Sequence, residues 1–275
     1  MTASILDRNR EAAYARDLVR AFGGALLFSV PLLMTMEMWS FGFTVEPVRL
    51  AVFILTALPL LLGLALYAGF SRLQGLKPAL LDAFVALAVG AITAAALLAL
   101  LAVLEPGAAP RQPVGQVALQ SVGGAMGALL ARRQLSAGRP EDDGDEDDAR
   151  YAGELFLMVA GALFLALNIA PTEETVLIAY RMGPWRAVGL VLVSLALMHA
   201  VVYLAGFAGQ EEQGHPVAAF FHYTLPGYAL VLLTSLYVLW IFGRIDGMHA
   251  SEIADAMVVL SFPGALGAAA ARLLV

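Results

Sequence analysis

Eight long apolar stretches constrain this chain more than any other feature. They cover residues 21–43, 47–70, 79–104, 113–133, 153–180, 184–207, 220–243 and 251–274. About 20 mostly apolar residues in helical conformation cross the hydrocarbon core of a bilayer. Backbone groups in lipid must be hydrogen-bonded within their own segment, and these stretches lack the period-2 alternation of barrel strands. We therefore predict an all-α transmembrane protein with eight helices that span the lipid bilayer.

The composition narrows the classes of protein further. Of the 275 residues, 60% are hydrophobic and 14% are charged, which leaves little room for a soluble domain. The absence of cysteine excludes disulfides, thiolate metal sites and cysteine nucleophiles. No phosphate loop or dinucleotide fingerprint is present, and the single lysine, Lys77, lies at a loop edge, which argues against a retinal Schiff base. We expect no cofactor and no nucleic-acid partner, while a homo-oligomer stays open.

The two halves of the chain resemble each other in three places. "GALLFSVPLLMTMEMW" (24–39) aligns with "GALFLALNIAPTEETV" (161–176), and "PVRLAVFIL" (47–55) aligns with "PWRAVGLVL" (184–192), both at an offset of about 137. "SVGGAMGALLARR" (121–133) aligns with "SFPGALGAAAARL" (261–273) at an offset of about 140. Matches in the same order with a nearly constant offset predict an internal repeat.

Each repeat has four spans, so both halves have the same orientation in the membrane. They are expected to be related by a pseudo-two-fold axis normal to the membrane, as in parallel-repeat transporters. The predicted organisation is a cytoplasmic amphipathic segment (1–20), a first four-helix repeat (21–133), an acidic cytoplasmic linker (134–151) and a second four-helix repeat (152–275).

Lysine and arginine set the orientation of the spans. One side collects Arg8, Arg10, Arg16, Arg20, Arg72, Lys77, Arg132, Arg133, Arg139, Arg150 and Arg272. The other side holds Arg49, Arg111, Arg181, Arg186 and Arg244. Because cytoplasmic loops are enriched in these residues, both termini are predicted to be cytoplasmic in a bacterial inner membrane.

Carboxylates in the first helix of each repeat are the strongest candidates for a functional site. Glu37 and Glu174 occupy equivalent positions, with Thr35 and Thr172 beside them, whereas Glu173 aligns with Met36. Charged side chains at membrane depth are expensive and are functional-site hypotheses. The pair is expected to face a polar cavity in the outer half of the membrane, where two close carboxylates cannot both be charged cheaply. The alternative is that both only cap or extend toward the outer helix ends.

Further polar residues form a stripe next to Glu174. Asn168, Thr172 and Thr175 recur at i, i+4 and i+7, and Pro171 removes a backbone hydrogen bond nearby. Free carbonyls, hydroxyls and carboxylates are hard oxygen ligands for cations. The alternative is a packing kink in which the threonines bond back to carbonyls of the preceding turn.

Four residues are candidates for a proton relay or gate. His199 and Tyr203 share a face of the sixth predicted helix, and histidine exchanges protons near neutral pH. Asp82 and His222 begin the third and seventh predicted helices at roughly equivalent places. The alternatives are a histidine bonded to a neighbouring helix and solvated helix-start residues. Gln116 and Gln120 on the fourth helix, and Asp255 on the eighth, rank lower.

Two other patterns have a structural and a functional interpretation. Glycines crowd the fourth and eighth helices, and we expect these two helices to cross each other closely, at the pseudo-two-fold axis or at a dimer interface. In the acidic run 141–148, Asp143, Asp145 and Asp147, with Glu154, match some EF-hand ligand positions. The sixth position lacks the required glycine, so a solvated linker is expected over calcium binding.

The whole chain resembles an uncharacterised bacterial family of integral membrane proteins with two carboxylate-bearing apolar halves, through "LMTMEMW" and "APTEETVLIA". This resemblance implies a membrane location. "LALNIAPTEE" also resembles the repeats of calcium/cation antiporters, which implies Thr172 and Glu174 as ligands. Those antiporters use inverted repeats, and the first copy here lacks the proline beside its glutamate.

"EETVLIAYR" followed by "SLALMHA" resembles membrane-embedded prenyl-protein proteases and related abortive-infection proteins. This resemblance implies that Glu173 or Glu174 activates water and that His199 binds a metal. Arg181 is seven residues after Glu174 instead of four, which is a departure from that pattern.

The sequence favours a non-enzymatic protein that moves a small cation or proton, as a channel or a transporter with a paired-glutamate site. No residue is assigned a catalytic role, and the metal, if any, is unknown. The alternatives are an intramembrane metal-dependent hydrolase and a non-transporting membrane scaffold.

Overall fold

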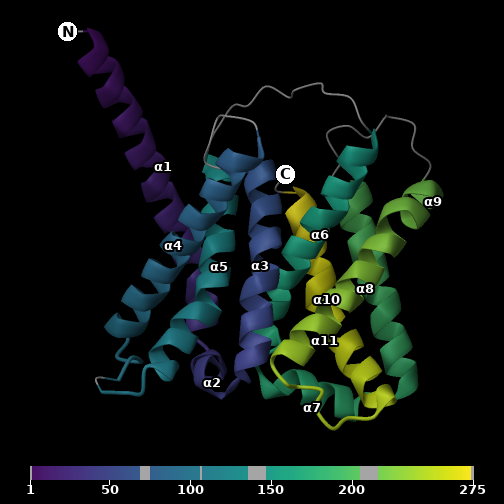
Figure 1. The fold of residues 1–275 in the computed structure, drawn as a ribbon. Helices are drawn as coiled ribbons and strands as arrows, with labels where there is room; N and C mark the ends of the chain where they lie inside the picture. Colours follow the sequence, from purple (N-terminus) through teal and green to yellow (C-terminus); the bar gives the residue numbers. More distant parts are fainter. Residues whose placement is uncertain (1, 69–74, 106, 136–146, 205–215, 274–275) are drawn as a thin grey trace. The chain divides into compact units, whose positions relative to one another are not determined.

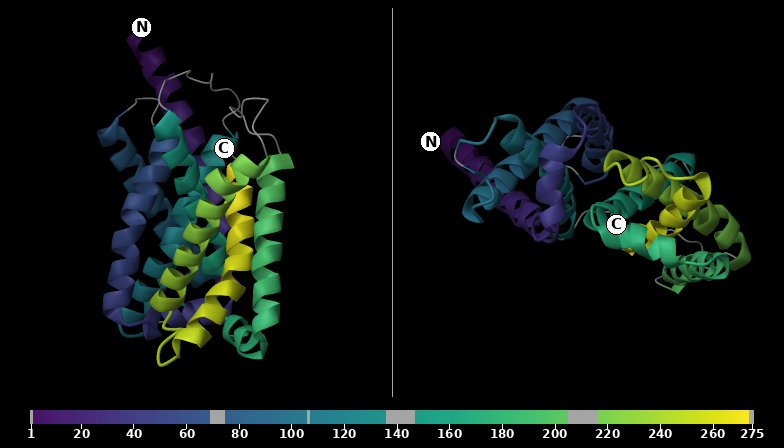
Figure 2. Two further views of the ribbon diagram at one scale, coloured as in Figure 1. Left: turned by 90° about the vertical axis from the view of Figure 1, so that its right-hand side faces the viewer. Right: turned by 90° about the horizontal axis from the view of Figure 1, so that it is seen from below.

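The computed structural model describes residues 2–68, 75–105, 107–135, 147–204 and 216–273, and within these ranges the chain is helical and contains no strand. The chain divides into two compact units, Met1–Glu141 (unit 1) and Asp142–Val275 (unit 2). Figure 1 and the left view of Figure 2 show the long helices of each unit running side by side.

The described residues of unit 1 form four long helices and one short one. They are α1 (Thr2–Leu33), α2 (Met36–Thr44), α3 (Pro47–Ala68), α4 (Leu76–Leu100) and α5 (Arg111–Leu135). Pro47 begins α3, where its missing N–H would have no helical partner in any case. Helix α1 continues without a break past residue 20, so the structure has no helix boundary between the N-terminal segment and the first apolar stretch.

Unit 2 has the same order of long and short helices, with one irregularity. Its elements are α6 (Asp147–Ile169), α7 (Glu173–Arg181), α8 (Pro184–Leu204), α9 (Pro216–Ala219), the π-helix η1 (Phe220–Thr224), α10 (Leu225–Ile241) and α11 (Ala250–Leu273). Helix α7 crosses the end of the long helices of its unit (Figure 1).

Two of the predicted continuous spans, 21–43 and 153–180, are wrong as continuous helices. Helix α1 ends at Leu33, and the helical axis turns by 89° before Met36–Thr44 continues as α2. Helix α6 ends at Ile169, and α7 begins at Glu173. The physical reason in unit 2 is Pro171, which cannot donate the next helical hydrogen bond. In unit 1, Thr35 adopts an extended backbone conformation between the two helices.

The last helix of each unit is its packing centre. Helix α5 packs against α1, α2, α3 and α4, and α11 packs against α6, α7, α8 and α10. Most of α5 is buried inside unit 1, consistent with its place among four neighbours. The core of each unit is therefore built around its C-terminal helix.

Glycines allow the first and last helices of each unit to touch. A Cβ on Gly24 of α1 would collide with the Gly127 carbonyl of α5, and a Cβ on Gly161 of α6 would collide with the Gly267 carbonyl of α11. The predicted small-residue faces of α5 and α11 thus serve close helix packing inside each unit.

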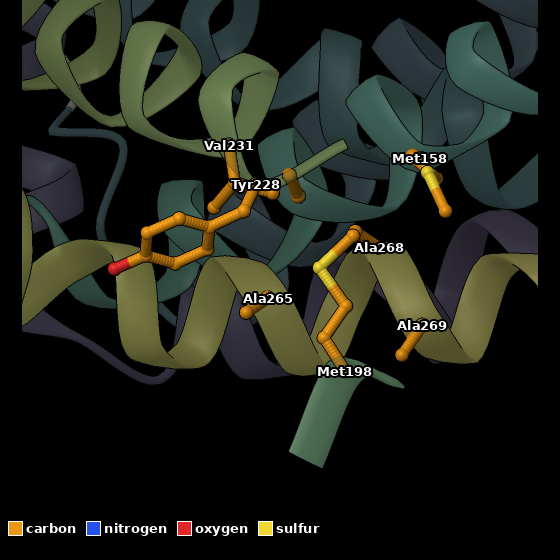
Figure 3. Close-up of a cluster of buried hydrophobic side chains, with 8 residues drawn as sticks. Met158, Met198, Tyr228, Val231, Ala265, Ala268 and Ala269 are labelled. Carbon is orange, nitrogen blue, oxygen red and sulfur yellow. The ribbon is translucent and has the colours of Figure 1, made fainter. Parts of the chain in front are cut away.

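One buried cluster of unit 2 consists of methionine, alanine, valine and one tyrosine. It comprises Met158, Ala162, Met198, Tyr228, Val231, Ala265, Ala268 and Ala269. Figure 3 shows these side chains projecting from several helices into one region beside α11. The flexible methionine side chains fill the space left by the alanines.

Within the described residues, seven helices are long and apolar enough to cross a membrane. They are Pro47–Leu66, Leu76–Leu100, Arg111–Ala131, Tyr151–Ile169, Pro184–Val201, Val217–Ile241 and Ala250–Ala271. The bent pair α1–α2 makes an eighth if it is counted as one span. Exposed apolar side chains on α8, such as Val188, Leu192 and Val193, fit contact with lipid tails.

Candidate functional site

The two helix breaks carry most of the predicted site residues, and they share several local features. Thr35 and Thr172 each immediately precede a nine-residue helix and have extended backbone dihedrals. Their hydroxyls donate to the last turn of the preceding helix, from Thr35 Oγ1 to the Leu32 carbonyl at 3.0 Å and from Thr172 Oγ1 to the Ile169 carbonyl at 2.8 Å. Each threonine therefore links the end of one helix to the start of the next.

Glu37 and Glu174 are both the second residue of their short helix. Unpaired backbone N–H groups give a helix N-terminus a partial positive charge, which favours a carboxylate there. Glu37 is half-buried, whereas Glu173 and Glu174 are exposed. The two carboxylates of the predicted pair therefore lie at helix starts that follow long apolar helices, and they do not lie in the middle of a straight span.

An indole group holds the break in unit 1. Trp39 Nε1 donates to the Leu33 carbonyl at 2.7 Å, which satisfies a carbonyl left free at the end of α1. Gln116 Nε2 of α5 donates to the Trp39 carbonyl at 3.2 Å. Helix α2 is thus bonded both to the end of α1 and to the packing centre of its unit.

An arginine holds the break in unit 2. The guanidinium of Arg244, in the loop between α10 and α11, donates to the Pro171 carbonyl. The carbonyl of the proline itself is therefore bonded to a protein cation. The sequence predicted that this segment offers free carbonyls to a cation. The Pro171 carbonyl is not free, because Arg244 donates to it.

The polar stripe around Pro171 bonds largely to its own backbone. Thr172 and Thr175 both donate to the Ile169 carbonyl, at 2.8 and 3.4 Å, and Asn168 Nδ2 donates to the Phe164 carbonyl at 2.7 Å. These bonds agree with the alternative interpretation of the sequence, in which the threonine hydroxyls bond to carbonyls of the preceding turn. Asn168 Oδ1 is buried without a hydrogen-bond partner among the described residues.

His199 contacts the π-helix at the other end of α8 from Glu174. Its Nδ1 lies 2.9 Å from Thr224 Oγ1, and its ring packs edge-on against Phe220 at a centroid distance of 5.4 Å. His199 is fifteen residues beyond Pro184, about 22 Å along the helix at 1.5 Å per residue. The structure therefore does not bring this imidazole next to Glu174. The side chain of Tyr203 lies outside the described residues.

The other two predicted gate residues have different surroundings. Asp82 lies in the second turn of α4 and is buried, so it is not a solvated residue at a helix start. His222 is exposed in η1, and its carbonyl accepts a hydrogen bond of 2.8 Å from the Tyr151 hydroxyl. Insertions of π-helix often occur at functional positions.

Metal binding finds little support in the part of the chain that is described. No group of three or more His, Cys, Asp or Glu side chains there is arranged to hold a metal ion. The acidic run 141–148, with Asp143 and Asp145, falls largely outside the described residues, and so do the side chains of 147–150.

Sequence reasoning missed Trp39 and Arg244, which hold the two breaks. The signal for Arg244 was a charged residue between glycines in "FGRIDG", a loop sequence between two apolar helices. Thr followed by glutamate one or two residues later, as in "TME" and "TEE", is a helix-start signal that marks both breaks.

Comparison with known proteins gives one family. No curated protein and no solved structure matches the chain. Residues 17–275 match the family described as "Putative integral membrane protein (DUF2391)", which covers nearly the whole sequence and agrees with the predicted membrane family. The apolar helices and this match together show that the chain is a multi-pass integral membrane protein and belongs to that family.

Proposed function

We propose that this protein moves a small cation or a proton across a bacterial inner membrane, with Glu37 and Glu174 at its ion site. The observation that carries the proposal is the matched geometry of the two helix breaks. In both, a threonine hydroxyl bonds back to the preceding helix, and a glutamate follows as the second residue of a nine-residue helix.

The chemistry of the two breaks fits attraction of a cation. Carboxylate and hydroxyl oxygens are hard ligands that small cations prefer. A carboxylate at the end of an apolar helix raises the local concentration of cations where they enter or leave the membrane. The proposed site comprises Glu37 and Glu174 with Thr35, Thr172 and Asn168, and Glu173 has a smaller part.

The proposal includes an arrangement of eight spans as two parallel four-helix repeats. Several matches support it: α2 and α7 have equal lengths, α3 and α8 both begin at proline, and the Gly24–Gly127 contact is matched by Gly161–Gly267. A parallel repeat places both glutamates at the same side of the membrane. The excess of Lys and Arg on the opposite side makes that side cytoplasmic.

A second set of residues serves proton transfer or gating in this proposal. It comprises His199, Tyr203, Asp82 and His222. The support for His199 is its hydrogen bond to Thr224 at the π-helix, because a ring nitrogen that shares a proton with a hydroxyl is able to relay it. Asp82 is supported by its burial inside unit 1.

Flux through proteoliposomes tests the paired-glutamate site. Vesicles containing a pH-sensitive or cation-sensitive dye should show flux with the unaltered protein. Glu37→Gln and Glu174→Gln should each reduce that flux strongly, and Glu173→Gln should reduce it weakly. Expression and melting should stay nearly unchanged because glutamine has the size of glutamate.

Glu46→Gln is the matched control. Glu46 is an exposed glutamate just before α3, and its ion pair with Arg49 at 3.6 Å is of the surface kind that contributes little to stability. Its loss should leave flux unchanged. Normal flux in the double variant Glu37→Gln, Glu174→Gln would reject the site, and an absence of flux in the unaltered protein would favour a scaffold.

A further inference from the structure

The interior of unit 1 contains polar side-chain atoms that no described protein group satisfies. Ser29 Oγ, Thr93 Oγ1, Gln116 Oε1 and both polar atoms of the Gln120 amide are buried without a hydrogen-bond partner among the described residues. These four residues are at most 3% exposed. Buried polar groups are almost always hydrogen-bonded, so a group of orphans calls for a partner from outside the protein.

Helix contacts bring these side chains to one place. A Cβ built on Gly124 of α5 would stand 2.9 Å from Ser29 Oγ and 2.9 Å from the Gly90 Cα of α4. Gln120 is one helical turn before Gly124 on the same face of α5. Thr93 is nearly one turn after Gly90 on α4, at the corresponding level because α4 and α5 run antiparallel. Ser29, Thr93 and Gln120 therefore surround one position between α1, α4 and α5.

Gln116 connects this position with the helix break. It lies one turn from Gln120 on α5, and its Nε2 donates to the Trp39 carbonyl of α2 while its Oε1 stays unpaired. Trp39 in turn holds the Leu33 carbonyl at the end of α1. A row of polar groups thus runs from the centre of unit 1 to the short helix that carries Glu37.

The donors and acceptors among the unpaired side-chain atoms indicate which kind of partner they need. The Gln120 amide offers donors and an acceptor, and the Ser29 and Thr93 hydroxyls each offer both. A metal cation would satisfy only the oxygens and would be repelled by the amide N–H groups. Water donates and accepts, and a buried water needs two to four such partners.

Three of these positions have apolar counterparts in unit 2. At the offsets of the sequence match, Ala166, Ala256 and Leu260 stand where unit 1 has Ser29, Gln116 and Gln120. All three are packed among helices, and Ala166 and Leu260 are fully buried. The polar row is therefore not needed for packing this arrangement of helices.

We infer that unit 1 binds a short chain of water molecules among Ser29, Thr93, Gln116 and Gln120. A consequence, which rests on the proposed function, is that the species carried past this chain is a proton and not a metal cation. Each water accepts one proton on one side and releases another on the other side, so no covalent change remains after a transfer. A metal cation would have to displace waters from donors that it cannot replace.

An experimental structure of the full chain in lipid nanodiscs tests the binding site directly. Density peaks should lie within hydrogen-bonding distance of Gln120 Nε2 and Oε1 and of Ser29 Oγ. A Gln120 amide bonded only to protein groups, or surrounded by apolar atoms without a density peak, would overturn the inference.

The direction of the change in melting temperature on replacing Gln120 is an independent test for bound water. In a dry site, Gln120→Met would remove an unsatisfied amide and raise the melting temperature. In a site that contains water, the same change leaves the waters short of partners and lowers it by about 2–4 °C. Met126→Gln is the control, because it places an amide at a fully buried apolar position on the same helix and should lower stability in either case.

Flux separates this inference from the proposed function. Gln120→Met should reduce proton flux in proteoliposomes to the protein-free background. A protein that transports a metal cation but no proton would overturn the consequence for the substrate. A protein without any flux would overturn the proposed function, whereas the density and melting results would still decide whether unit 1 binds water.

Discussion

Units 1 and 2 use a similar helical frame around different interiors. In both, the last helix is the packing centre and touches the first helix at a pair of glycines. The interior of unit 1 contains the polar side chains of Ser29, Gln116 and Gln120, whereas the buried residues at the aligned positions of unit 2 are Ala166, Ala256 and Leu260. The comparison teaches that glycine contacts determine the close approach of the helices and leave the polarity of the remaining core positions variable.

The helix breaks also differ between the units in what holds them. In unit 1 the neutral Trp39 side chain bonds to the end of α1, and in unit 2 the cationic Arg244 reaches from a distant loop to Pro171. The break in unit 1 is thus bonded by a residue of its own short helix, with a further bond from Gln116 of α5, whereas the break in unit 2 depends on the loop between α10 and α11. We expect the second break to be more sensitive to changes elsewhere in its unit.

The orientation of the two units in the membrane tests whether they are equivalent, because the result is either parallel or not. Two parallel units with the same number of spans require both termini and the linker to be on one side. Reporter fusions at Ala137 and Val275 should both report the cytoplasm. A periplasmic signal from either fusion would break the equivalence of the units and the pairing of Glu37 with Glu174.

The glycine contacts should give the largest change in stability. Gly24→Ala and Gly161→Ala each place a methyl group against a backbone carbonyl, so each should lower the free energy of unfolding by about 3 kcal/mol. Unfolding in mixed micelles measures both values. Equal decreases in the free energy of unfolding would support the equivalence of the two helical frames, and a decrease in only one unit would contradict it.

Neighbouring glycines supply matched controls for that experiment. A Cβ on Gly23 of α1 or on Gly189 of α8 would meet no atom within 4 Å. Gly23→Ala and Gly189→Ala should therefore gain up to about 1 kcal/mol from the higher helix propensity of alanine.

Removal of Arg244 should affect unit 2 alone. Arg244→Met eliminates a charged hydrogen bond to the Pro171 carbonyl and should cost about 2 kcal/mol of unfolding free energy. Hydrogen exchange should increase around α7 and stay unchanged around α2. Arg186→Met, at an exposed position of α8, should change stability by less than about 0.5 kcal/mol. Faster exchange in α2 would contradict the independence of the two breaks.

Two serines at matched positions should give the smallest difference. Ser121 and Ser261 both donate to a carbonyl three residues earlier, but Ser261 Oγ also lies 2.9 Å from the Tyr228 hydroxyl. Ser261→Ala should therefore cost about 1 kcal/mol more than Ser121→Ala. In a double-mutant cycle, Tyr228→Phe should remove most of that extra cost, and full additivity would show that the bond contributes nothing.

The sequence predicted the long helices well because hydrophobicity is summed over about 20 residues. Seven of the eight apolar stretches contain a helix suited to cross a membrane, and the first does so only together with α2. The turn at Thr35 was missed because α2 is as apolar as the helix before it, so hydropathy alone does not reveal a change of direction. Thr35 and Thr172 with the following glutamates carried the information as helix-start signals.

The sequence predicted which residues form the candidate site better than it predicted the contacts of those residues. The equivalence of Glu37 and Glu174 follows from local alignment, and the structure gives both the same place in a short helix. The bond from Arg244 to Pro171 joins residues 73 positions apart, so no periodicity or spacing signals it. The polar row of unit 1 was only partly visible, because Gln116 and Gln120 stood out on α5 whereas Ser29 and Thr93 are ordinary residues of apolar helices.

The contact between the first and last helix of each unit also determines when the chain is able to fold. Helix α1 has its glycine face ready early in synthesis, but the partner surface around Gly127 is made only after α3 and α4. Unit 1 therefore completes its core when α5 enters the membrane, before the ribosome has translated most of unit 2. We therefore expect the nascent protein to fold in two successive steps, and a chain stalled after α5 has left the ribosome and entered the membrane should display a finished first half.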